Sequence, residues 1–115
     1  KLEYRVKRIG RATWRRDRFV ALAGTGEVAT RAVQVPAGAR RLQVNADARA
    51  GQLRVELCDV DGRVLAGFAR EDCASITGDD LRAEVRWQGG DVPAGAVKLR
   101  FALAGARLYS FTFVD

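Results

Sequence analysis

The sequence contains no histidine. This absence removes the Ser-His-Asp and Cys-His nucleophilic systems, histidine-ligated zinc and histidine general bases. Carboxylates, lysine and tyrosine are still present as catalytic groups, but the commonest machinery of catalysis is missing. We therefore expect a chain that is not an enzyme and that carries no metal or other cofactor.

Cysteine is scarce, with Cys58 and Cys73 the two in 115 residues. Two cysteines do not make a disulfide-dense scaffold. Either one bridge joins them, or they are independent thiols of which one is buried. Alternation along the strand predicted at 52–58 places Cys58 on the wet face. Neither possibility tells which compartment the protein occupies.

Long apolar runs are also absent. No stretch approaches the roughly 20 apolar residues of a membrane-spanning helix, so we expect no membrane partner. The sequence has no signal peptide and no initial methionine. We therefore expect the natural protein to continue before Lys1.

The net charge of +6 comes entirely from one end of the chain. Residues 1–18 hold eight basic and two acidic residues, whereas the rest of the chain holds twelve of each. This distribution predicts a basic arm or linker over residues 1–18 and a neutral domain over residues 19–115. Trp14 lies in the arm, where it contacts a preceding domain or folds back onto the edge of this one; the sequence favours neither.

The neutral part is dominated by alternation of apolar and polar residues, most clearly over residues 41–68. Side chains of a strand point to opposite faces in turn, so this pattern predicts strands with one buried and one wet face. It predicts three strands here, with breaks at Ala50-Gly51 and at Asp61-Gly62; the second break is typical of a hairpin turn. The expected apolar faces consist of Leu42, Val44, Ala46, Ala48, Leu53, Val55, Leu57, Val64, Ala66 and Phe68.

Similar patterns flank this unit, and no window shows helical periodicity. Pro36 and Pro93 each stand in the repeated sequence Val-Pro-Ala-Gly-Ala, which indicates one turn type feeding two strands. About eight short strands with frequent turns predict an all-β fold, an antiparallel, jelly-roll-like β-sandwich. Besides the three above, short strands or apolar runs are expected over residues 2–7, 19–23, 28–35, 81–87, 97–104 and 109–113, with a turn at Gly105.

Acidic residues in two loops raise the question of a calcium site. Residues 59–62 resemble the start of a calcium loop, but the later ligands of an EF-hand are absent, so a hairpin turn is the better interpretation. Residues 78–80 offer too few ligands for a structural ion and are better explained as capping. Glu56 and Glu84 fall on wet strand faces beside arginines, as is typical of cross-strand ion pairs.

Exposed aromatic and amide side chains are the candidates for sugar contacts. Alternation places Trp87, Phe111 and Phe113 in the core, whereas Tyr109 begins a strand and keeps its hydroxyl wet. The candidate carbohydrate-binding residues are Trp14, Asn45 and Tyr109. The alternative is that the polar row of the strand predicted from residue 41 is a plain solvated face without a ligand, and the residues alone favour this alternative. Nucleic-acid binding ranks below both, because the neutral domain lacks a basic face with interleaved aromatics.

The chain also carries an ordered set of short segments. They are RDRFVAL (16–22), VATRAV (28–33), LQVNA (42–46), LRVEL (53–57), DVDG (59–62), GF (67–68), DC (72–73), TGD (77–79), VRW (85–87), VKLRF (97–101) and LYSF (108–111). In this order the set resembles the C-terminal β-sandwich module of bacterial glycoside-hydrolase-like enzymes, which follows a β-propeller catalytic domain. The resemblance spans residues 16–113.

The resemblance implies a function that composition does not. It implies a secreted or cell-surface, non-catalytic accessory module that binds polysaccharide or oligosaccharide or braces the preceding catalytic domain, which holds the hydrolytic residues. The alternative is that the basic arm binds an anionic polymer, either nucleic acid or an acidic polysaccharide, with the strong salt dependence of such contacts.

Overall fold

The computed structural model describes the backbone of residues 4–7, 11–15 and 18–115, and the side chains from residue 23 onward. In this part of the chain there is no α-helix, and one 3-10 turn, η1 (Arg70–Asp72), is present. The prediction of an antiparallel all-β protein is confirmed. The strands are β1 (Tyr4–Lys7), β2 (Arg11–Arg15), β3 (Arg18–Thr30), β4 (Val33–Val35), β5 (Arg41–Asp47), β6 (Gln52–Cys58), β7 (Asp79–Val85) and β8 (Gly95–Val114).

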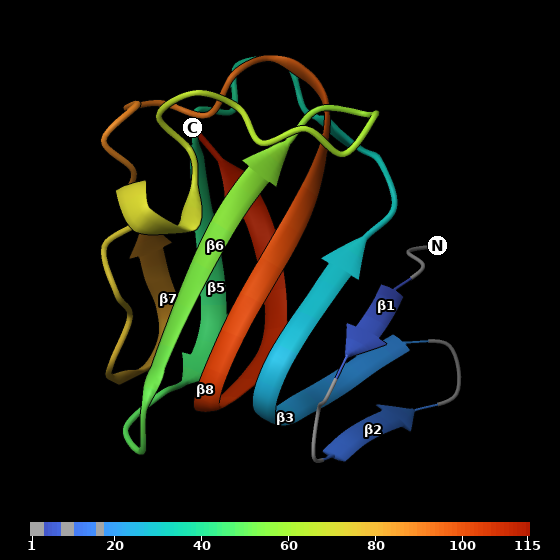
Figure 1. The fold of residues 1–115 in the computed structure, drawn as a ribbon, viewed down its shortest axis with the longest axis vertical. Coiled ribbons are helices and arrows are strands. Elements are labelled where there is room, and N and C mark those ends of the chain that lie inside the picture. The colour runs from blue at the N-terminus through green and yellow to red at the C-terminus, as the bar shows by residue number, and fades with distance from the viewer. Residues whose placement is uncertain (1–3, 8–10, 16–17) are drawn as a thin grey trace.

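Strand β8 is the centre of the sheet and is 20 residues long. Its first half pairs with β6 and the second half of β3, while its second half pairs with β5 and the first half of β3. The chain bends between these halves at Gly105, whose φ of 62° suits a residue without a Cβ. In Figure 1 the first half of β8 lies in front with β6 and β3, and the second half lies behind it with β5.

The sequence predicts two strands separated by a turn at Gly105, and this prediction is wrong. The glycine bends one continuous strand instead of reversing it. The apolar run expected over residues 19–23 likewise does not end there, since β3 continues through Gly24 and Gly26 to Thr30 and is 13 residues long. Hydrogen bonding therefore runs without interruption from β1 to β7, and the sandwich or jelly-roll arrangement of two separate sheets is not confirmed.

The predicted basic arm contributes backbone to this sheet. β1 pairs with the second half of β3 and β2 pairs with its first half. Trp14 of β2 stands opposite Phe19 in the register, but its side chain lies outside the described residues. A boundary between an arm and a domain at residue 18 stays a prediction.

One hydrophobic core takes side chains from both halves of the folded sheet. The inner faces predicted along 41–48 and 52–57 are confirmed, since Leu42, Val44 and Leu53 are among the buried members of this core. Trp87 is buried as expected, and Phe111 and Phe113 pack against the core while partly exposed. The most completely enclosed large side chains are Phe101, Leu42, Leu53, Leu57, Leu99 and Leu108.

The third predicted strand, over residues 64–68, does not form. Val64 makes only an isolated bridge to Cys58 and its side chain is 41% exposed. The chain instead turns at residues 59–62, where the Asp59 carboxylate accepts hydrogen bonds from the amides of Asp61 and Arg63. The turn interpretation of this segment is confirmed, and the segment after it folds back over β6.

Cys58 and Glu56 contradict the expected wet face of β6. Both are buried, because the loop that carries η1 covers the outer face of this strand. Cys58 and Cys73 are both free and buried, and burial raises the pKa of each thiol. Neither thiol has the low pKa of a reactive nucleophile.

Leu81 contradicts the expected core face of β7, since it is 76% exposed. Val44 pairs with Ala83 and Ala46 pairs with Asp80, so two residues of β7, Leu81 and Arg82, stand opposite Asn45. An extra residue in one strand shifts every side chain beyond it to the other face. This β-bulge turns Leu81 outward.

Candidate functional site

The wet row of β5 forms the middle of a polar outer face. Gln43 pairs with Glu84 on β7 and Thr112 on β8, and Asn45 pairs with Ser110. Partners directly opposite in an antiparallel pair share a face, so these side chains gather on one surface. This surface offers hydrogen-bonding groups from three neighbouring strands.

The structure brings two of the three predicted sugar-contact residues together. Asn45 and Ala46 stand opposite Ser110 and Leu108, which leaves Tyr109 as the extra residue of a bulge in β8. Asn45 therefore lies between two bulges, and bulges often redirect side chains at functional surfaces. Asn45 and Tyr109 are both half-buried. Trp14 lies on β2, separated from β8 by β3.

Arg49 controls the ionisation of Asp47 at the end of this face. It donates two side-chain hydrogen bonds to the carboxylate, at 3.0 and 2.8 Å, and one from its backbone amide. These hydrogen bonds lower the pKa of Asp47 from 3.8 to about 2. The folded state thus favours the ionised form, and the resulting stability is present above about pH 4 and is lost as the pH falls toward 2.

We expect a carboxyl NMR titration of the whole chain to give Asp47 a midpoint of about 2. In Arg49→Gln the midpoint should return toward 3.8, because the hydrogen bonds that favour the carboxylate are lost. An Asp47 midpoint that does not move in Arg49→Gln would contradict this assignment.

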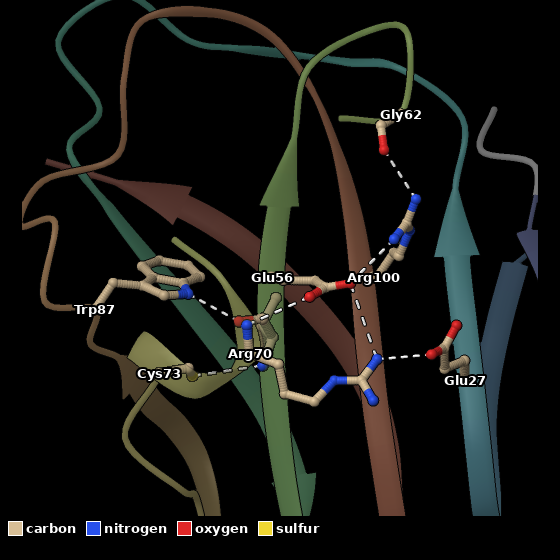
Figure 2. A network of polar contacts seen from close by, with 8 residues as sticks. Glu27, Glu56, Gly62, Arg70, Cys73, Trp87 and Arg100 are labelled. Carbon is tan, nitrogen blue, oxygen red and sulfur yellow. Dashed lines mark hydrogen bonds and ion pairs between the residues drawn. The ribbon is translucent and has the colours of Figure 1, made fainter. Parts of the chain in front are cut away.

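A network of charged groups holds the covering loop against β6 (Figure 2). The carboxylate of Glu56 accepts hydrogen bonds from the Arg70 amide at 3.3 Å and from Arg100 Nη1 at 3.2 Å. The Arg70 side chain donates to Glu27 at 2.6 Å, which raises the pKa of Arg70, and Arg100 donates to the Gly62 carbonyl. Both oxygens of Glu56 are occupied and its side chain is 9% exposed, so this network is structural rather than open to a substrate.

The same loop, together with Trp87 after β7, satisfies the free edge of β6. The Trp87 indole donates to the Val55 carbonyl at 2.8 Å, and the Val55 amide donates to Cys73 Sγ (Figure 2). Leu57 exchanges hydrogen bonds with the loop through Leu65 and Phe68. An unpaired strand edge invites association with other chains, and these contacts cover it.

A cavity of about 300 Å³ opens where β5 and β7 separate. The register brings Leu42 opposite Val85, and beyond this pair the loop after β7 inserts, with the Val92 amide bonded to the Arg40 carbonyl. Arg41, which lines this cavity, donates to the carbonyl of Asp115, the C-terminal residue marked in Figure 1. We call the cavity the arginine notch; it is lined by Arg40, Arg41, Glu84, Val85, Arg86, Trp87, Gly90, Asp91 and Val92.

The notch has an apolar floor and a charged rim. Val85, Trp87 and Val92 are buried and form the floor. Arg41 is occupied, since it donates to Glu84 at 3.3 Å and through two nitrogens to the Asp115 carbonyl. Arg86 lies 3.8 Å from Glu84 with its side chain 75% exposed, so its terminal nitrogens are available.

Sequence reasoning missed this notch. In the sequence Arg40, Arg86 and Asp91 look like ordinary solvated charges, and only Glu84 stands out, as an ion-pair partner. The one available signal is that Arg40 immediately precedes one predicted strand and Arg86 lies near the end of another, next to side chains expected to be buried. Within the described residues, no group of three or more Cys, Asp and Glu side chains is placed to hold a metal ion.

Comparison with known proteins identified no relative of this chain. No family model, curated protein or solved structure matches this chain. In the part of the chain that the structure describes, no helix is both long and apolar enough to span a membrane. Function is therefore inferred from the residues and the geometry of the chain itself.

Proposed function

We propose that this chain is a non-catalytic accessory module of a carbohydrate-active enzyme, acting outside the cell or at its surface. It binds a polysaccharide or oligosaccharide and lies against the catalytic domain of the same protein. The folded sheet then serves as the β-sandwich of such a module, with the jelly-roll-like arrangement that the strand pattern predicts. The observation that supports this proposal best is the arginine notch, with its buried apolar floor and its rim of hydrogen-bond donors and acceptors.

A sugar matches both parts of the notch. Its ring carbons present an apolar face, while each hydroxyl both donates and accepts hydrogen bonds. Small-molecule sites typically combine such an apolar surface with a few polar groups that fix orientation, and their volumes start at roughly 300 Å³. The notch, at about 300 Å³, therefore suits one terminal sugar unit better than a long stretch of chain.

The polar row of β5 extends this site. Arg41, Gln43 and Asn45 alternate with buried residues and so share the outer face of β5. At about 3.3 Å per residue, Asn45 lies roughly 13 Å along the strand from Arg41. Further units of a glycan seated in the notch would pass Gln43 toward Asn45 and Tyr109. The predicted sugar-contact residues thus form the far end of the proposed site.

Calorimetry of the chain against plant and bacterial polysaccharides tests this proposal. We expect saturable binding to at least one of them, no turnover of model glycosides, and at least tenfold weaker binding in Asp91→Ala, which removes an acceptor from the rim. Asp61→Ala is the matched control, because Asp61 is an exposed loop aspartate outside the notch. An absence of binding across the panel would refute the glycan-binding function and leave only a bracing role.

A further inference from the structure

We propose that the arginine notch selects a carboxylate-bearing sugar, a uronic acid unit of an acidic polysaccharide. This inference rests on the proposed function and narrows its ligand. Arg40 and Arg86 bind the carboxylate, and Glu84 and Asp91 accept hydrogen bonds from the hydroxyls of the same unit. The binding surface is the notch and not the basic N-terminal segment.

The donors for an anion are present and uncommitted. Arg40 is exposed, and its side chain makes no hydrogen bond or ion pair within the described residues. Arg86 keeps one long ion pair, to Glu84, and its terminal nitrogens make no hydrogen bond within the same part of the chain. A guanidinium presents donors in a planar fork that matches a carboxylate, so these two side chains offer the geometry that such a group requires.

The acceptors on the rim decide which anion fits. Glu84 and Asp91 are carboxylates, which only accept hydrogen bonds when ionised. A phosphodiester, or a sugar whose hydroxyls are mostly replaced by sulfate esters as in dextran sulfate, brings negative charge and few donors, so it would face Glu84 and Asp91 mainly with repulsion. A uronic acid brings one carboxylate and several hydroxyl donors on one ring. Its two kinds of group therefore complement the arginines and the acids of the notch together.

The apolar floor adds a requirement for a ring. Val85, Trp87 and Val92 are each at most 7% exposed and close the base of the cavity. Water bound against such a surface is displaced favourably by the carbon face of a sugar. A small inorganic anion would leave this floor uncovered, so charge alone does not account for the shape of the site.

The test measures calorimetric binding of the whole chain to polygalacturonate, to alginate, to fully methyl-esterified polygalacturonate and to dextran sulfate. We expect binding to at least one of the two uronates, and at least tenfold weaker binding to the methyl ester and to dextran sulfate. Arg86→Gln and Arg40→Gln should each weaken uronate binding roughly tenfold, as expected for loss of a charge-assisted hydrogen bond. Arg82→Gln is the matched control, because it removes the same charge from an exposed position of β7 outside the notch.

The outcomes separate this inference from the function on which it rests. Binding to a neutral polysaccharide with no uronate binding would overturn the acidic-sugar assignment and keep the carbohydrate-binding module. Equal binding to dextran sulfate and uronates, unchanged in Arg40→Gln and Arg86→Gln, would overturn it in favour of the basic N-terminal segment. If no polysaccharide, neutral or acidic, binds to the chain, both the acidic-sugar assignment and the glycan-binding function are refuted.

Discussion

Replacing Gly51 by alanine is expected to unfold this protein at a temperature about 10 °C lower or more. Gly51 lies in the connection from β5 to β6, where an added Cβ would fall 1.6 Å from the Ala104 carbonyl oxygen. That atom belongs to the backbone of β8 at its bend, so no side-chain rotation relieves the overlap. Overpacking typically destabilises by 1–3 kcal/mol, and a clash with backbone at the centre of the sheet belongs at or above about 3 kcal/mol.

Thermal unfolding followed by circular dichroism gives the measurement, and Gly78→Ala gives the control. A Cβ at Gly78 would meet no atom within 4 Å, and its φ is not in the left-handed region. Alanine there should leave the melting temperature unchanged or raise it slightly, since it restricts the unfolded chain. Equal melting temperatures for Gly51→Ala and Gly78→Ala would mean that the β5–β6 connection does not press against the bend of β8.

The bend of β8 at Gly105 could not be predicted from the sequence. Glycine at 105 is typical of a chain reversal, and the alternation on either side of it looks like two strands. The long strand exists because each half finds a different set of partners, β6 for the first and β5 for the second. Whether Gly105 makes a turn or a bend depends on the pairing of β8 with strands that are distant in the sequence. The local pattern of residues does not contain this information.

Alternation predicted the inner faces well wherever the register is regular. It failed at Leu81, where a bulge inserts one residue and reverses the face of the residues beyond it, and the same kind of insertion occurs at Tyr109. It failed differently at Cys58 and Glu56. Their side chains do point away from the core, but alternation within a strand cannot reveal that a loop covers its outer face.

The candidate site was also only partly predictable from local patterns in the sequence. Asn45 is predictable because the polar row of β5 is local and regular. The notch depends on Arg40 and Arg86 lining one cavity, beside which the Val92 amide donates to the Arg40 carbonyl. Charged residues at strand ends are common on any β-protein surface. Only their convergence over a buried floor distinguishes these, and convergence is a tertiary property.

Replacing Glu56 by glutamine is expected to cost about 2–3 kcal/mol of unfolding free energy. The substitution keeps the shape of the side chain and an acceptor for the Arg70 amide, but leaves Arg100 without its carboxylate. Removing one partner of a fully buried ion pair typically costs about 3–5 kcal/mol. The value expected here is lower because the side chains of Arg70 and Arg100 are each 36% exposed and therefore partly solvated.

Glu84→Gln is the comparison that isolates burial as the cause. Glu84 also lies within 4.0 Å of two arginines, Arg41 and Arg86, but its side chain is 30% exposed against 9% for Glu56. Exposed pairs contribute about 0–1 kcal/mol and are screened by salt, so Glu84→Gln should have little effect on urea unfolding. The Arg70 amide should also exchange faster with solvent in Glu56→Gln, because the charge that holds the loop on β6 is gone. Equal losses of stability in the two variants would show that the loop is held by its hydrophobic contacts and backbone hydrogen bonds, and not by the network around Glu56.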